Sequence, residues 1–466
     1  MKRIIKSIYI SAAHKSSGKT IVSIGLSRIL SNLNHNIQTF KKGPDYIDMS
    51  WLSLSSRTNS YNLDFNTQSK KEIIDFYNNK KSHINIIEGN KGLYDGINVK
   101  GTDDNSAMSI LTDSPVILVI DTEGITRGIA PLLQGYINFE KKCNIKGVIL
   151  NKVKTERHEN KLVNSVKNYT DLKIVGSIRK NKDLIISERH LGLMPPNENN
   201  SAEKKIELIS KIILESIDIK SFSKCGLDIK KNKKTFGNKI SKKNIENKNK
   251  NKNKIKLGVL RDKSFGFYYP DDLEKFEEYG VEVKYINSTR TKNLPDIDAL
   301  MIGGGFPEIN AENISKNKRL MRDIKSFIES DGVCYAECGG LMYLSESINY
   351  KNKTHQMVGL IPGKINMCEK PIGRGYVKLD INKSHLWGVN KNSKINAHEF
   401  HHANIIFKKN AKNNYTFKVK RGYGIDGTYD GFQYKNLLAN FSHLRHTKKY
   451  PWIKYFINFI EERRDD

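Results

Sequence analysis

The sequence has few cysteines and no long apolar run, and these absences exclude several classes of protein. Its five cysteines form no Cys-x-x-Cys pair and have no metal-ligand spacing, which argues against a disulfide framework and a zinc module. No stretch approaches the roughly 18 consecutive apolar residues of a membrane-spanning helix. The short apolar N-terminus is interrupted by Lys6 and passes directly into a polar loop, which is unlike a signal peptide. We therefore expect a cytoplasmic protein that binds no membrane.

Acidic residues are also scarce, because 50 aspartates and glutamates face 79 lysines and arginines, a net charge of +29. This excess raises the hypothesis of nucleic-acid binding. Its densest part is a lysine- and asparagine-rich stretch, residues 221–254, which has almost nothing to bury and is predicted to be a disordered linker. The other lysines are spread over the chain without a basic helix or interleaved aromatic residues. We expect a solvated basic surface and no nucleic-acid partner.

Alternating strands and helices are predicted on both sides of the linker. Residues 84–88 and 115–121 are continuous apolar runs that end in an acid, a pattern typical of central parallel strands buried on both faces. The alternation resumes at 256–262 and gives way to shorter strands from about residue 355. The predicted fold class is α/β, with a doubly wound parallel-sheet domain and then a second α/β domain. The predicted boundaries are 1–220, 221–254 for the linker, and 255–466.

A phosphate-binding loop follows the first predicted strand. In such a loop, backbone N–H groups at a helix N-terminus hold the phosphates, the lysine neutralises charge, and the threonine hydroxyl ligates Mg²⁺. The glycine that usually stands five places before Gly18 is Ala13 here. The loop nevertheless follows a predicted strand directly, and this position supports its assignment as a phosphate-binding loop. The nucleotide-binding residues are predicted to be Ser16, Ser17, Gly18, Lys19 and Thr20.

Several acids follow the next predicted strands and should lie near this loop. The segment KGPDYID (42–48) places two carboxylates three residues apart in what is predicted to be a rigid charged turn. A lone acid at a strand end is often only a helix cap, but four acids near a phosphate loop favour a role in metal and substrate positioning. We predict Thr20, Asp45 and Glu88 as metal ligands, and Lys41, Asp48 and Asp95 as substrate-binding residues.

Residues 332–344, GVCYAECGGLMYL, predict a buried strand, a sharp turn and a helix opening at Leu341. A thiol at such a turn is exposed beside unpaired backbone N–H groups, which favour a thiolate, although a buried structural cysteine is the ordinary alternative. Cys338 is therefore predicted to be a nucleophile, and His443, near the end of a later predicted strand, its base. The oxyanion hole is predicted at Gly304, Gly305 and Gly339.

Three clustered histidines, His398, His401 and His402, raise the question of a zinc site. No carboxylate or thiolate stands near them at metal-ligand spacing, so we favour a role in substrate binding.

These residues together carry a resemblance. The segments SSGKT, KGPDYID, YNLDFN, IEGNKGLYDG, ERHLGL, GGGFPE, AECGGLMYL, HEFHH and the final SHL occur in the order seen in cobyrinate a,c-diamide synthases. The resemblance implies an N-terminal domain similar to dethiobiotin synthetase and a C-terminal class I glutamine amidotransferase domain, with Cys338 as nucleophile and His443 as its activator. In many class I amidotransferases a glutamate stands two residues after that histidine, but here the position holds Arg445. We therefore expect a Cys–His dyad whose orienting group the sequence does not identify.

The activity implied by the resemblance is an ATP-dependent amidation that uses glutamine as nitrogen donor. ATP with Mg²⁺ would activate a carboxylate as an acyl phosphate, and ammonia released at Cys338 would convert it to an amide, twice on the a and c carboxylates of cobyrinate. The expected partners are a tetrapyrrole polycarboxylate, glutamine and ATP, and the expected state is a monomer or homodimer. Alternatives are hydrogenobyrinate or nickel-sirohydrochlorin as substrate, or cobyric acid synthase activity. From other classes, a P-loop switch ATPase would explain only the first domain, and a nucleic-acid-binding protein only the charge.

Overall fold

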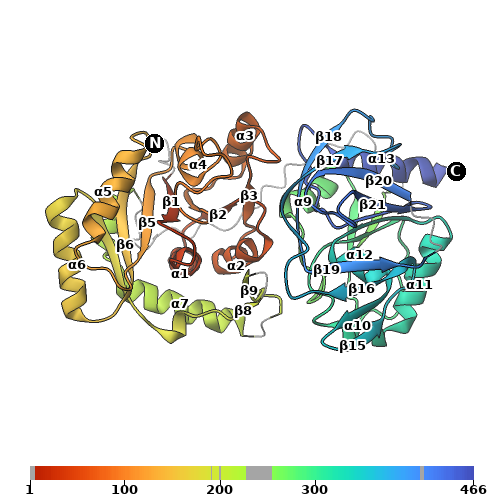
Figure 1. The fold of residues 1–466 in the computed structure, drawn as a ribbon, viewed down its shortest axis with the longest axis horizontal. Helices are drawn as coiled ribbons and strands as arrows, with labels where there is room; N and C mark the ends of the chain where they lie inside the picture. The colour runs from red at the N-terminus through yellow and green to blue at the C-terminus, as the bar shows by residue number, and fades with distance from the viewer. Residues whose placement is uncertain (1–5, 190–191, 199–200, 227–253, 410–413, 466) are drawn as a thin grey trace. The chain divides into compact units, whose positions relative to one another are not determined.

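The computed structural model describes residues 6–465 apart from 190–191, 199–200, 227–253 and 410–413. The chain forms two compact units, Met1–Ile245 and Glu246–Asp466 (Figure 1). The segment predicted as a linker begins inside helix α8 (Ile219–Lys224), and most of it lies outside the described residues. None of the described helices has both the length and the apolar character needed to cross a membrane.

The first unit is built on a seven-stranded sheet in the order β3-β2-β4-β1-β5-β6-β7. Every neighbouring pair is parallel, which confirms the predicted doubly wound sheet and brings the carboxyl ends of its strands to one edge. The strands are β1 (Lys6–Ala12), β2 (Ile37–Lys42), β3 (Tyr61–Leu63), β4 (Ile84–Glu88), β5 (Val116–Asp121), β6 (Ile145–Val153) and β7 (Lys173–Arg179).

Helices cover both faces of this sheet. Helices α3 to α6 share one apolar core with it, whereas α1, α2 and α7 pack together on the opposite face (Figure 1). The helices before α8 are α1 (Lys19–Asn32), α2 (Tyr46–Ser56), α3 (Lys70–Lys80), α4 (Asn105–Leu111), α5 (Ile129–Phe139), α6 (Glu156–Tyr169) and α7 (Ala202–Ser216). A short 3₁₀ turn, η1 (Lys182–Leu184), and a small hairpin, β8 (Glu188–Arg189) with β9 (Gly192–Leu193), lie between β7 and α7.

The second unit contains a nine-stranded mixed sheet in the order β11-β10-β12-β13-β22-β21-β20-β17-β18. The five strands from β11 to β22 run parallel and the others antiparallel. Its strands are β10 (Lys256–Leu260), β11 (Glu282–Ile286), β12 (Ala299–Ile302), β13 (Val333–Glu337), β17 (Gly373–Ile381), β18 (Lys394–His401), β20 (Asn414–Arg421), β21 (Tyr429–Tyr434) and β22 (Leu437–Asn440). The second α/β unit is thus confirmed.

A four-stranded sheet, in the order β15-β14-β16-β19, packs into the same unit. Its strands are β14 (Ser345–Tyr350), β15 (Lys353–Gln356), β16 (Ile361–Met367) and β19 (Ala403–Phe407). The helices of the unit are α9 (Pro270–Glu278), α10 (Ala311–Lys316), α11 (Lys318–Glu329), α12 (Gly339–Leu344) and α13 (Trp452–Asp465). In α11, Leu320, Ile324 and Ile328 recur every four residues and are fully buried, so one helical face anchors it to the core.

The segment after β2 differs from the prediction. Residues 42–48 were expected to form a rigid charged turn, but helix α2 (Tyr46–Ser56) begins inside this segment. Asp45 is the N-cap residue, and its side chain accepts a hydrogen bond from the backbone N–H of Asp48. The Gly-Pro pair therefore ends the strand and starts a helix, so the two aspartates occupy different positions of a helix N-terminus.

Candidate functional site

The phosphate loop joins β1 to α1 in a conformation that requires glycine at its last position. Gly18 has a φ of 96°, and a Cβ there would lie 2.2 Å from Nδ2 of Asn151. That amide donates a 2.8 Å hydrogen bond to the carbonyl of Ser17. The loop is thereby held against the end of β6, and α1 starts directly at Lys19 with its first N–H groups directed to the carboxyl edge of the sheet.

Lys19 is the cation of this loop, and its side chain is almost completely buried. Burial, with a smaller contribution from the Lys41 ammonium, lowers the pKa of Lys19 to about 8. A phosphate group bound at the loop would supply the negative charge that a buried ammonium lacks. The geometry therefore fits a site for phosphoryl oxygens.

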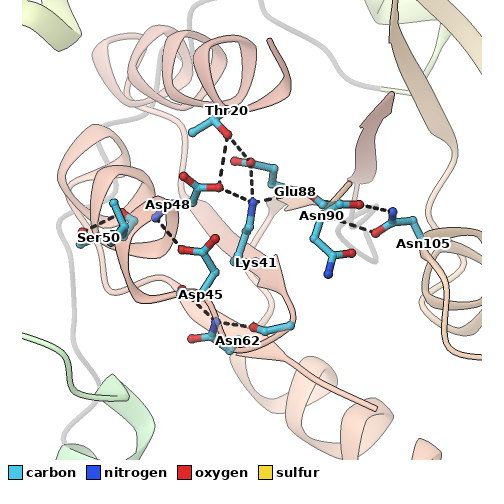
Figure 2. Close-up of polar contacts among 12 residues, drawn as sticks. Thr20, Lys41, Asp45, Asp48, Ser50, Asn62, Glu88, Asn90 and Asn105 are labelled. Carbon is cyan, nitrogen blue, oxygen red and sulfur yellow. Dashed lines mark hydrogen bonds and ion pairs between the residues drawn. The ribbon is translucent and has the colours of Figure 1, made fainter. Parts of the chain in front are cut away.

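Lys41, at the end of β2, is the centre of a buried polar cluster (Figure 2). Its Nζ lies 2.6 Å from Oδ2 of Asp48 and 2.7 Å from Oε1 of Glu88. The hydroxyl of Thr20 donates to the same Glu88 oxygen at 2.7 Å. Burial alone would lower the pKa of Lys41, but the two carboxylates hold it above its usual range. Residues from the phosphate loop, α2 and β4 thus converge on one cation.

The side chain of Asp45, which was predicted as a metal ligand, caps α2 beside this cluster. Its Oδ1 accepts the backbone N–H of Asp48 at 2.9 Å, and burial raises the pKa of Asp45 to about 7. Asp48, which was predicted as a substrate-binding residue, accepts hydrogen bonds from the hydroxyl of Thr20 and the ammonium of Lys41 (Figure 2). The start of helix α2, which the sequence analysis did not predict, gives the two aspartates these different contacts.

The loop that contains Asp95 is tied to the phosphate loop. Oδ2 of Asp95 accepts the backbone N–H of Gly92 at 2.9 Å, and the N–H of Leu93 donates to the carbonyl of Ala12. Asn105, which the sequence analysis did not identify, donates to the carbonyls of Asn90 and Gly92 at 2.5 Å each. No local motif marks Asn105, because its partners precede it by 13 and 15 residues.

In the second unit, Cys338 occupies the turn between β13 and α12. Its φ is 48°, in the left-handed region that non-glycine residues rarely adopt, and a Cβ on Gly340 would lie 2.2 Å from the carbonyl oxygen of Ile302. The N–H of Cys338 donates to the carbonyl of Asn440 at 2.7 Å, which ties the turn to the end of β22. The helix opens two residues earlier than predicted, at Gly339.

His443 lies three residues beyond β22 and is hydrogen-bonded to the Cys338 side chain. Its Nδ1 is 3.3 Å from Oε2 of Glu337, the last residue of β13. Burial alone would lower the pKa of His443, but the hydrogen bonds with Cys338 and Glu337 outweigh it and raise the pKa to about 10. The group beside His443 that the sequence did not reveal is therefore Glu337, immediately before the cysteine. Arg445 points to Asp271 instead, at 3.1 Å.

The glycines predicted to form an oxyanion hole lie next to these side chains. A Cβ on Gly304 would be 2.5 Å from Cε1 of His443, and one on Gly339 would be 3.1 Å from the backbone nitrogen of Gly305. The N–H of Gly303, by contrast, already donates to the hydroxyl of Tyr268 at 2.8 Å. The backbone around Gly305 and Gly339 is therefore close enough to receive an oxyanion formed at Cys338.

The three clustered histidines separate in the structure. His398 stacks on His443, with ring centroids 4.9 Å apart, and His401 stacks on Phe441. Burial lowers the pKa of His398 far below its usual range, and the neighbouring His443 and Arg445 lower it further. Within the described ranges, no group of three or more histidine, cysteine or acidic side chains is placed to hold a metal ion.

Comparisons with known proteins match both units. Residues 9–193 match the CobQ/CobB/MinD/ParA nucleotide binding domain, and residues 256–450 match the CobB/CobQ-like glutamine amidotransferase domain. The cobyrinate a,c-diamide synthase of Magnetococcus marinus is 33% identical over 98% of both chains. That of Archaeoglobus fulgidus is 35% identical over 94% of both chains, and that of Methanococcus maripaludis strain C5 is 34% identical over 95% of this chain and 96% of its own.

Proposed function

Since the chain belongs to the cobyrinate a,c-diamide synthase family, we propose that it amidates the a and c carboxylates of cobyrinate with ATP and glutamine. It is a glutamine-dependent amidating ligase with a nucleotide-binding domain and a glutamine amidotransferase domain. The observation that carries the proposal is the presence of two separately built sites, a phosphate loop beside a buried acid cluster and a Cys–His pair on a sharp turn. We place this chemistry in the cytoplasm, in a monomer or homodimer with no nucleic-acid partner.

In the first unit, the phosphate loop and Lys19 bind the triphosphate of ATP. A substrate carboxylate oxygen attacks the γ-phosphorus, ADP leaves, and the product is an acyl phosphate. This activation is needed because hydroxide is a poor leaving group from a carboxylate. Lys41 lies beside the reacting centre and neutralises charge on the transferred phosphoryl group, whereas Asp95, at the edge of the same site, contacts the tetrapyrrole. Ammonia then displaces phosphate and forms the amide.

Mg²⁺ fits the oxygen atoms that surround Lys41. Carboxylate oxygens of Asp48 and Glu88 contact the ammonium of Lys41, and the hydroxyl of Thr20 donates to the same Glu88 oxygen. Among the described residues, Oε2 of the fully buried Glu88 has no hydrogen-bond partner. Mg²⁺ favours one or two carboxylates together with phosphate and water oxygens. When bound there, it would neutralise the charge of the phosphates during transfer.

We propose Asp48, rather than Asp45, as a metal ligand beside Thr20 and Glu88, and this gives a direct prediction. Asp48→Asn should strongly weaken Mg²⁺-dependent nucleotide binding in calorimetry. Asp45→Ala should lower the free energy of unfolding by about 1 kcal/mol, because it removes the cap of α2, and should largely keep that binding. Ser69→Ala, which removes the cap of α3, is the matched control for cap loss. If Asp45→Ala lost Mg²⁺-dependent binding and Asp48→Asn retained it, Asp45 would be the metal ligand, as the sequence analysis predicted.

In the second unit, the Cys338 thiolate attacks the side-chain amide carbon of glutamine. The oxyanion rests on backbone N–H groups near Gly305 and Gly339, and His443 gives its proton to the leaving ammonia. Water, deprotonated by His443, then hydrolyses the glutamyl thioester and releases glutamate. His398 packs against the face of His443 and limits how its ring can turn.

Mass spectrometry tests the substrate assignment. Purified protein with ATP, Mg²⁺ and glutamine is offered cobyrinate, hydrogenobyrinate and nickel-sirohydrochlorin. We expect cobyrinate to gain two amide groups, in two resolvable steps, with two ADP formed per molecule. Double amidation of another member of the panel, with cobyrinate unchanged, would reassign the substrate, and ATP hydrolysis without amide formation would contradict the ligase.

A further inference from the structure

Glu337 is a buried acid beside the nucleophile to which the sequence assigned no role. It is 3% exposed, and both of its oxygens are held in place. Oε1 accepts the backbone N–H of Leu444 at 2.8 Å and the hydroxyl of Tyr335. This leaves Oε2 directed at Nδ1 of His443, 3.3 Å away.

We propose that Glu337 is the positioning residue of the Cys338–His443 pair, which fixes the orientation of His443 and stabilises its protonated form. The inference rests on the proposed glutamine hydrolysis at Cys338. In many class I amidotransferases the acid that contacts the catalytic histidine stands two residues after it. Here the acid that contacts His443 is the residue immediately before Cys338. Because β13 and β22 are adjacent parallel strands, their ends bring Glu337 and His443 together although 106 residues separate them.

The other groups that face His443 cannot take this role. Arg445 is a cation paired with Asp271 and lies over the ring of Tyr269, 4.8 Å from its centroid. His398 is stacked on the imidazole face and is kept neutral by burial and by its cationic neighbours. Among the described groups named here as facing this imidazole, Glu337 is therefore the anion besides Cys338, which receives or gives the proton.

The carboxylate also selects the reactive tautomer. With an anion at Nδ1, that nitrogen keeps its hydrogen, and Nε2 is free to exchange a proton with the thiol. A glutamine at position 337 would accept from Leu444 through its oxygen and direct its NH₂ group at Nδ1. That contact favours the tautomer with hydrogen on Nε2, which cannot accept the thiol proton. Loss of the charge also lowers the pKa of His443 from its raised value.

The experiment compares the pH dependence of glutamine hydrolysis in wild-type, Glu337→Gln and Glu337→Asp proteins. For Glu337→Gln we expect kcat to fall by about 10²- to 10⁴-fold with a nearly unchanged KM, and the alkaline limb of the kcat profile to move down by about one pH unit. Glu337→Asp, which keeps the charge one methylene farther away, should show a smaller loss and a smaller shift in the same direction. If Glu337→Gln does not fold, the shift in Glu337→Asp decides the test.

Asp430→Asn is the control for a purely structural role. Asp430 is equally buried and accepts the backbone N–H groups of Phe441 and Ser442, next to His443. Asp430→Asn should lower the melting temperature and leave the alkaline limb in place. The inference would be overturned if Glu337→Gln left both kcat and the alkaline limb of its pH profile unchanged. It would also be overturned if Asp430→Asn shifted the alkaline limb as much as Glu337→Gln does. Cys338→Ser separates the two hypotheses. If glutamine-dependent amidation survives this substitution, the proposed function is refuted. If amidation is lost in Cys338→Ser while Glu337→Gln remains fully active, only the inference about Glu337 is refuted.

Discussion

Replacing Cys338 with serine is expected to reduce glutamine-dependent amidation at least about 10⁴-fold while leaving amidation with added ammonia close to wild type. A serine hydroxyl is a far weaker acid than a thiol, so the imidazole of His443 cannot hold it as an anion, and the glutamyl intermediate does not form. The residues proposed to bind ATP and activate the carboxylate lie in the other unit and are unchanged. Amide formation is measured by mass spectrometry with glutamine or ammonium salts as the nitrogen source.

Cys334→Ala is the matched control for this prediction. Cys334 lies four residues earlier, on strand β13, which leads into the turn at Cys338, and is fully buried. Burial raises the pKa of its thiol, so it takes no part as a thiolate. Cys334→Ala should cost stability through a small cavity and keep both activities. If Cys338→Ser abolished synthesis with ammonia as well as with glutamine, the division of labour between the two units would be wrong.

Much of the fold could be predicted because its central strands are continuous apolar runs. Residues 84–88 were predicted and observed as a strand, since a strand buried on both faces shows a clear local signal. The three-residue strand β3 gives no such signal, because only its pairing with β2 makes it a strand. Helix α2 was missed because Gly43 and Pro44 suggested a turn, although an aspartate at the N-cap with a second three residues later also fits a helix start.

The sites were predictable where a local sequence pattern marked their residues. The phosphate loop and the turn at Cys338 are local patterns, so both could be placed from the sequence and now stand as proposals with a defined geometry. The choice between Asp45 and Asp48 as the proposed metal ligand depends on where helix α2 begins, and the sequence analysis did not predict that helix. The contact between Glu337 and His443 depends on the pairing of β13 with β22, and no spacing rule reports a pairing between distant strands.

Lys19→Ala is expected to remove amidation with either nitrogen source, by at least about 10³-fold, because the ammonium acts on charge that develops during phosphoryl transfer. Glutamine hydrolysis by the second unit should persist, which separates this variant from Cys338→Ser. The melting temperature should remain at or slightly above the wild-type value. The lowered pKa of Lys19 means that folding disfavours its charged form, so removal of the ammonium relieves that cost.

Lys173→Ala provides the control, because Lys173 is an exposed lysine at the start of β7 and therefore at the opposite edge of the same sheet. It removes one positive charge from the same unit and should leave nucleotide binding and synthesis unchanged. Calorimetric titration with ATP should show weak binding to Lys19→Ala and normal binding to Lys173→Ala. Near-normal synthesis from ammonia by Lys19→Ala would refute the phosphate-loop assignment. An equal loss of ATP binding and synthesis in Lys173→Ala would mean that the total positive charge of the unit, and not Lys19 itself, is responsible for the effect. The specific outcome is expected because Lys19, unlike Lys173, is buried at the loop that we propose binds the triphosphate.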